Sequence, residues 1–187
     1  MPRLFLAVDL DDKLKRRLTG VPAELGLSGL RVVSHEQLHL TVRFLGDVDE
    51  ARVGDVLAAA ATAARSHAPF PLELAGGGSF GPPGRPQVVW VGVADATAVR
   101  ALADDVDAAL APIPCAPRDH PFTAHVTLGR VRGRLGGDLR ALTSLGHLGT
   151  MTVERVTLFR STPMAGGSRY QVIGQAPLAR DGAQGAS

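Results

Sequence analysis

Runs of apolar residues bounded by polar or turn residues predict seven strands along the chain. Short runs of this kind, rich in branched and aromatic side chains, are typical of β-strands. They occur at about residues 4–10, 38–45, 70–74, 87–93, 122–131, 152–159 and 170–173. The segment 76–86 is dense in glycine and proline, and it therefore predicts a loop between two of these strands.

Apolar residues at helical spacing predict about four helices between the strands. Acidic residues that can cap a helix precede three of them. These three helices begin near Asp11 or Asp12, near Asp47 or Asp49, and at Asp95, and a short fourth helix is expected near residues 139–145. Because several strand pairs are joined by hairpin-length loops, the order of elements favours an α+β fold over a doubly wound parallel sheet.

The length and composition fit one domain, or two small lobes that share a core. The chain has 187 residues, of which 45% are hydrophobic. We expect residues 1–179 to form this domain and residues 180–187 to be a disordered tail. The longest apolar stretches, at 56–61 and 88–93, are far shorter than the roughly 20 residues of a membrane span. The N-terminal apolar run is too short for a secretory signal, so we expect a soluble, cytoplasmic protein.

Cysteine content and charge say little about chemistry by themselves. Cys115 is the only cysteine, so the chain can form neither an intramolecular disulfide nor a thiolate metal site. It lies among prolines without a nearby base, which favours an incidental thiol over a nucleophile. The formal charge is only +2, but arginines, which suit phosphate recognition, crowd together at positions 130, 132, 134 and 140. A general preference for arginine over lysine would produce the same composition.

A repeated tetrapeptide is the most informative feature of the sequence. His39-Leu40-Thr41-Val42 recurs 86 positions later as His125-Val126-Thr127-Leu128, each time inside a predicted strand. Residues two apart on a strand point to the same face, so each histidine projects beside its threonine while the apolar partners face the core. Four polar groups can therefore line one cleft.

This set of groups suits in-line attack on a cyclic phosphodiester. One imidazole can remove a proton from the attacking water while the other protonates the departing ribose oxygen, because histidine changes charge near neutral pH. The threonine hydroxyls can donate to the phosphate oxygens as negative charge develops. A single His-x-Thr would more often be structural, but two copies with apolar partners favour a site. The other histidines, at 35, 67, 120 and 147, show no such pattern and receive no chemical role.

The chain resembles the bacterial branch of the two-histidine phosphoesterases that contains 2′-5′ RNA ligases and RNA 2′,3′-cyclic phosphodiesterases. The hallmark of this family is a duplicated His-x-Thr/Ser-x motif. The resemblance covers the opening strand at 3–10, the first motif at 37–48, the middle strand at 88–93, the second motif at 122–130, and the closing hairpin at 158–161 with Gly166 and Tyr170. One departure is Ala124, where the family commonly has proline, and it removes no catalytic group.

The resemblance implies a fold, a reaction and roles for the motif residues. The fold would be two pseudo-symmetric α+β lobes, with antiparallel-rich sheets lining a central cleft and helices packed outside. RNA with a 2′,3′-cyclic phosphate end would be the substrate, hydrolysed to a 2′-phosphate. We expect a monomer, and the two-histidine chemistry itself requires neither a metal nor a cofactor. His39 would protonate the leaving 3′ oxygen and His125 would activate water. Thr41 and Thr127 would hold the phosphate, and Arg130 matches a family arginine beside the second motif.

Two arginines and two aromatic residues are further candidates for substrate contacts. Strict alternation places Arg130 on the strand face opposite His125, so its involvement would require a β-bulge. Arg43 is better placed by alternation, although a solvated charge is an equal alternative. Phe44 and Trp90 could stack on a base, but apolar residues within strands more often belong to the core.

Three other functions stay open at this point. The same site could join a 2′,3′-cyclic phosphate end to a 5′-hydroxyl end, which would make the protein a 2′-5′ RNA ligase. A non-catalytic module that binds RNA ends would not need both imidazoles, so the duplicated motif argues against it. A histidine metal site is the third alternative, and it falls short of the usual number of ligands.

Overall fold

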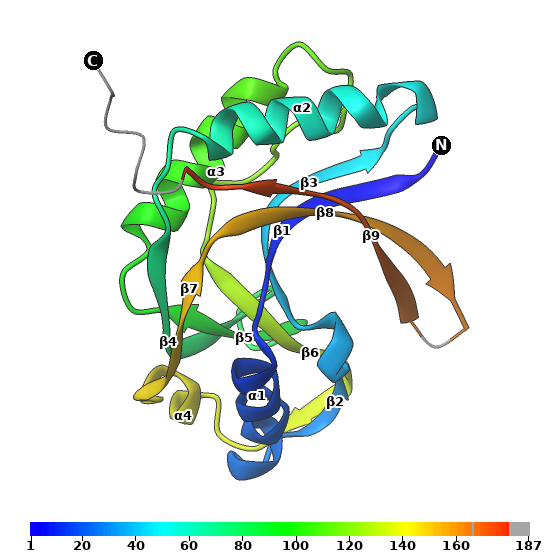
Figure 1. Ribbon diagram of the computed structural model, residues 1–187. Coiled ribbons are helices and arrows are strands. Elements are labelled where there is room, and N and C mark those ends of the chain that lie inside the picture. Colours follow the sequence, from blue (N-terminus) through cyan, green and yellow to red (C-terminus); the bar gives the residue numbers. More distant parts are fainter. Residues whose placement is uncertain (166, 180–187) are drawn as a thin grey trace.

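The strands form a single curled sheet in which every pairing is antiparallel (Figure 1). The computed structural model describes residues 1–165 and 167–179, and this part of the chain contains nine strands. They are β1 (Arg3–Asp9), β2 (Ser28–Val32), β3 (His39–Asp47), β4 (Phe70–Phe80), β5 (Val88–Val93), β6 (His125–Gly136), β7 (His147–Val153), β8 (Arg155–Met164) and β9 (Gly167–Pro177). Their order is β7-β4-β5-β6-β3-β1-β8-β9, and β2 pairs with β6.

The strand order divides the sheet into two similar lobes that meet between β3 and β6. One lobe contains β3, β1, β8 and β9, and the other contains β6, β5, β4 and β7, so the motif strand lies innermost in each. A single register pair, Leu40 with Val126, joins the two lobes. This arrangement confirms the expected α+β fold with two pseudo-symmetric halves and antiparallel sheets.

The helices cover the outer face of the sheet (Figure 1). Helices α2 (Val53–Ala64) and α3 (Thr97–Leu110) pack on each other and on strands of the first lobe, whereas α1 (Asp12–Glu24) and α4 (Arg140–Thr143) pack on the second. Short 3₁₀ helices lie at His35–Gln37 and Glu50–Arg52. The carboxylate of Asp11 caps α1 as predicted, because it accepts a 2.8 Å hydrogen bond from the amide of Leu14. None of the helices in the described residues is long and apolar enough to cross a membrane.

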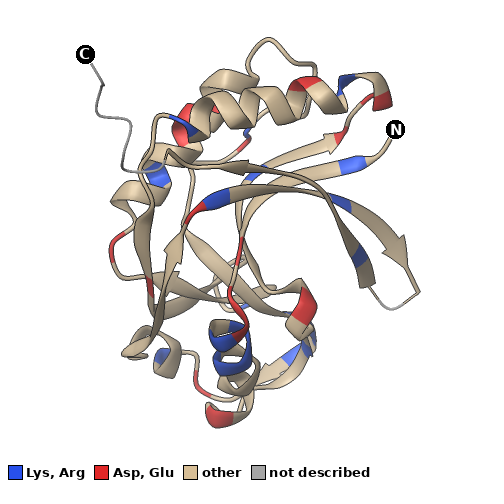
Figure 2. Ribbon diagram, viewed as in Figure 1, with Lys and Arg blue, Asp and Glu red and all other residues tan. Residues whose placement is uncertain are grey.

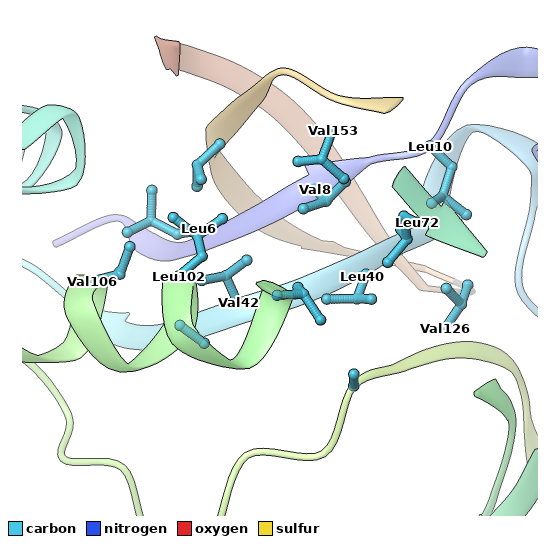
Figure 3. Packing of buried hydrophobic residues seen from close by; sticks show 14 of the residues in the cluster. Leu6, Val8, Leu10, Leu40, Val42, Leu72, Leu102, Val106, Val126 and Val153 are labelled. Carbon is cyan, nitrogen blue, oxygen red and sulfur yellow. The ribbon is translucent and has the colours of Figure 1, made fainter. Parts of the chain in front are cut away.

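The main core lies between this outer face and the helices. Alternate residues of the two motifs, Leu40 and Val42 in β3 and Val126 in β6, are buried there beside Leu102 of α3 and its neighbours (Figure 3). The motif histidines and threonines consequently point to the other face of the sheet, as the alternation predicted.

Several elements differ from the sequence prediction. Strand β2 was not predicted, and the predicted strand at 152–159 is interrupted at Glu154 between β7 and β8. The segment predicted as a glycine-rich loop belongs in part to β4. Gly78 permits this because the Trp90 side chain packs against it, and a Cβ atom at Gly78 would lie 2.8 Å from the indole ring. The expected disordered tail at 180–187 lies outside the described residues.

Candidate active site

The contact between β3 and β6 brings both motifs to one cleft on the concave face of the sheet. Because the two strands run antiparallel through the Leu40–Val126 pair, the residues on either side of that pair face the same space. His39, Thr41, His125 and Thr127 all line a cleft of about 540 Å³. The four polar groups that the sequence predicted to act together are therefore assembled in one place.

A main-chain carbonyl fixes the orientation of His39. Its Nδ1 lies 2.6 Å from the carbonyl oxygen of Gln37, so Nδ1–H donates and Nε2 is left to face the cleft. Nε2 lies 3.0 Å from the hydroxyl oxygen of Thr41. The ring centroid of Phe5 is 4.9 Å away, and the ring of Tyr170 meets the imidazole edge-on at 5.4 Å. The imidazole is held on an aromatic floor with one nitrogen available for proton transfer.

His125 is oriented in the same way from the other lobe. Its Nδ1 lies 2.7 Å from the carbonyl oxygen of Thr123, which is again the residue two positions earlier. The ring of Phe80 packs edge-on at 4.9 Å, and that of Trp90 lies 6.0 Å away. Both histidines thus present Nε2 to the cleft, which is the arrangement that an acid–base pair requires.

Burial lowers the pKa of both histidines below the ordinary value. For His39 the loss of solvent is the largest cause, and the carbonyl of Gln37 and the carboxylate of Asp9 oppose it, while His125 and Lys15 lower the pKa further. For His125 burial again dominates, and the carbonyl of Thr123 opposes it. A lowered pKa leaves an imidazole neutral near pH 7, so a proton acceptor is ready in the free protein.

A β-bulge brings Arg130 into the cleft. In the pairing of β6 with β5, Thr127 lies opposite Trp90, but the next pair joins Gly129 to Val89, so Leu128 is an extra residue. Leu128 and Gly129 are buried in succession, and Arg130 returns to the face of the histidines, where it lines the cleft. The sequence prediction made the involvement of Arg130 conditional on such a bulge.

An equivalent bulge in β3 removes Arg43 from the cleft and corrects its predicted position. Thr41 pairs with Ala7 and Arg43 with Leu6, so Val42 is the extra residue and simple alternation fails beyond it. The Arg43 side chain is only 7% exposed, and its Nε donates to a carboxylate oxygen of Asp107 on α3 at 2.5 Å. Arg43 therefore ties β3 to α3 and does not line the cleft.

The bulge in β3 places Phe44 where Arg43 was expected. Its side chain lines the cleft and is 48% exposed, which is unusual for phenylalanine within a strand, and the Arg3 guanidinium lies 5.8 Å from its ring centroid. The expectation that Phe44 belongs to the core was wrong. Trp90 is half-buried against Gly78 and Phe80, outside the residues that line the cleft.

Other residues of the cleft were missed because they come from distant strands. Arg31 of β2, Gln37 at the end of the first 3₁₀ helix, and Ser168 and Tyr170 of β9 all contribute to its walls. The side chain of Gln37 donates to the carbonyl of Ser168, which fastens the β8–β9 hairpin to the other wall. No local sequence pattern links these positions, so only the sheet topology reveals them.

The remaining histidines lie apart from the cleft. His35, His67 and His147 contact the carboxylates of Asp12, Asp105 and Glu73, and His120 is highly exposed. Within residues 1–165 and 167–179, no group of three or more histidine, cysteine or acidic residues could hold a metal ion.

Comparison with known families accounts for the two-lobed arrangement. A family model described as LigT-like phosphoesterase matches residues 4–90 and matches again at 91–170, once for each motif. The chain belongs to the LigT-like phosphoesterases. A relative from Archaeoglobus fulgidus, named RNA 2′,3′-cyclic phosphodiesterase, is 39% identical over 134 residues, covering 70% of this chain and 73% of that protein. One of the same name from Aeropyrum pernix is 33% identical over 172 residues, covering 88% and 91%.

A solved structure agrees with this LigT-like phosphoesterase over almost its whole length. Escherichia coli LigT, crystallised in complex with 3′-AMP, superposes with a TM-score of 0.78 at 25% identity, covering 95% of this chain and 98% of that one. The likeness therefore extends over both lobes.

Proposed function

We propose that this LigT-like phosphoesterase hydrolyses RNA 2′,3′-cyclic phosphate ends to 2′-phosphates by acid–base catalysis with two histidines. One observation carries the proposal: His39 and His125 enter one cleft from opposite lobes, each oriented by a carbonyl so that Nε2 is available. The names of the relatives from Archaeoglobus and Aeropyrum support RNA as the substrate class.

In the proposed reaction His125 Nε2 removes a proton from water, and the water oxygen attacks the phosphorus. The bond between phosphorus and the 3′ oxygen breaks, and protonated His39 gives its Nε2 proton to that oxygen. The products are a 2′-phosphate and a 3′-hydroxyl. Thr41 and Thr127 donate hydrogen bonds to the non-bridging oxygens as charge develops on them. In the free protein the Thr41 hydroxyl already lies 3.0 Å from Nε2 of His39, so the threonine also orients its histidine.

The neighbours of the two histidines support this direction of proton transfer. Asp9 is the register partner of His39 across the β1–β3 pair, whereas the register partner of His125 is Gly92. A carboxylate beside an imidazole favours its protonated form. Lys15, whose amino group lies 2.7 Å from Asp9, opposes this effect. Burial lowers the pKa of both histidines, but only His39 has a carboxylate that raises it, which supports His39 as the proton donor.

Phe44 is a candidate contact for a nucleobase. Exposed aromatic side chains commonly stack on unpaired bases of RNA, and Phe44 lies on the same face as the catalytic groups with half of its surface exposed.

The proposal requires neither a metal nor a cofactor. It also describes a monomer in the cytoplasm, where a chain with a single cysteine needs no oxidising surroundings.

Product analysis tests the proposed function. A short RNA ending in a 2′,3′-cyclic phosphate is incubated with the protein, with and without a second RNA carrying a 5′-hydroxyl. The expected product is a 2′-phosphate end in both reactions. A 2′-5′-linked product would assign ligation instead, and binding of the RNA without turnover would assign an RNA-end-binding module.

A further inference from the structure

Two arginines lie directly opposite each other in the wall of the cleft. Arg31 of β2 and Arg130 of β6 are register partners in an antiparallel pair, and both line the cleft. Figure 2 shows where lysine and arginine positions lie along the ribbon. Like charges on directly opposed residues destabilise a sheet. Among the described residues neither guanidinium has a carboxylate within 4 Å, and no aspartate or glutamate lines the cleft. An anion between the two side chains would relieve the repulsion.

The backbone of β2 packs closely against β6 around Arg31. A Cβ atom at Gly129 would lie 3.0 Å from the carbonyl oxygen of Arg31, so glycine allows β2 to approach β6. A Cβ atom at Gly167 would lie 2.6 Å from a guanidinium nitrogen of Arg31, so glycine at the tip of the β8–β9 hairpin makes room for this side chain. The guanidinium of Arg31 is thereby held between the hairpin and the cleft.

The arginine pair is close to the reacting groups but separate from them. Arg130 follows Thr127 by three residues, which places their Cα atoms about 10 Å apart at the usual rise of a strand. Burial raises the pKa of Tyr170 and the charge of Arg130 opposes this change, so Arg130 lies within electrostatic reach of the tyrosine that packs against His39. An anion held by both arginines would therefore be a neighbour of the reacting phosphate.

We infer that Arg31 and Arg130 form a subsite for a second phosphate, the one that joins the terminal nucleotide to the preceding nucleotide of the RNA. This inference rests on the proposed function and adds a preference to it. A cyclic mononucleotide has no such phosphate, whereas a dinucleotide ending in a cyclic phosphate has one. The planar guanidinium groups match phosphate oxygens in geometry and charge. The enzyme is therefore selective for the ends of chains over cyclic mononucleotides.

The test compares kcat/KM for a nucleoside 2′,3′-cyclic monophosphate with that for a dinucleotide ending in a 2′,3′-cyclic phosphate. The wild type is expected to prefer the dinucleotide by at least about 10-fold, the usual scale for a hydrogen bond to a charged group. Arg31→Gln and Arg130→Gln should each reduce this ratio about 10-fold, and Arg31→Lys should reduce it less. Added salt should weaken the preference of the wild type and have less effect in the glutamine variants.

Arg65→Gln is the matched control, because Arg65 follows α2 on the surface and loses the same charge away from the cleft. Its ratio should equal that of the wild type. Circular dichroism reports whether each variant is folded, and loss of mononucleotide turnover in a folded Arg130→Gln variant would place Arg130 on the reacting phosphate and overturn the subsite. Equal ratios in the wild type and both glutamine variants, with the mononucleotide turned over, would overturn the second-phosphate subsite while the proposed function stands. Failure of the wild type to hydrolyse either compound would overturn the proposed function and the subsite together.

Discussion

Replacing Arg43 tests whether this residue ties β3 to α3, as the structure indicates, or binds phosphate, as strand alternation suggested. Arg43→Met keeps much of the side-chain length and removes the ion pair with Asp107 and the hydrogen bonds to the carbonyls of Phe44 and Ala116. Leaving a buried polar group without its partner costs about 1–3 kcal/mol. The Asp107 carboxylate is 35% exposed and lies 3.7 Å from Arg118, so it keeps part of its solvation and one partner.

These contacts set the expected loss of stability at about 2–4 kcal/mol, since three acceptors lose a charged donor while one of them, Asp107, retains another partner. Urea unfolding followed by circular dichroism would measure the loss, and the added variant Asp107→Asn should recover part of it. At a temperature where the variant is folded, kcat and KM should stay close to the wild-type values. An unchanged free energy of unfolding together with a large rise in KM for RNA would refute the assignment and return Arg43 to the substrate.

Three further predictions concern the cleft. Thr41→Val and Thr127→Val should each lower kcat by about 10²-fold with a smaller change in KM, because the lost donor acts on the transition state. Kinetics at saturating RNA would measure kcat. A change in KM alone would mean that the threonines only position the RNA. Phe44→Leu should raise KM for RNA severalfold and Phe44→Trp should not; equal KM values in both variants would exclude stacking. Asp9→Asn removes the carboxylate that raises the pKa of His39. The alkaline limb of the pH–rate profile reports deprotonation of the acid, so this limb should move to lower pH. Movement of the acidic limb instead would exchange the roles of the two histidines.

The chemistry of the site could be predicted because it depends on residues that are close together in the sequence. His39 with Thr41 and His125 with Thr127 lie two apart on strands, and their apolar partners are sufficient to decide which face is buried. The duplication then placed both pairs in one cleft. The cap at Asp11 was predictable for the same reason, since it depends on residues within one turn.

The wider cleft could not be predicted because it depends on pairing between distant strands. An extra residue directly after the threonine of each motif, Val42 or Leu128, reverses the side-chain alternation, and nothing in their local sequence marks a bulge. Because of this reversal Phe44 lines the cleft where Arg43 was expected. Arg31 was missed with the whole of β2, because that strand is short, mostly exposed and stabilised by its pairing with β6.

We propose that His39 and His125 carry out hydrolysis without a metal. The most direct measurement is the rate at which a short RNA with a 2′,3′-cyclic phosphate end is converted to its 2′-phosphate, by the wild type and by His39→Ala and His125→Ala, each with and without a strong chelator. We predict that each variant loses at least about 10²-fold in kcat while still binding the RNA, and that the chelator leaves the wild-type rate unchanged. A folded variant with near wild-type turnover, or activity that disappears with the chelator and returns with a divalent metal, would contradict the account.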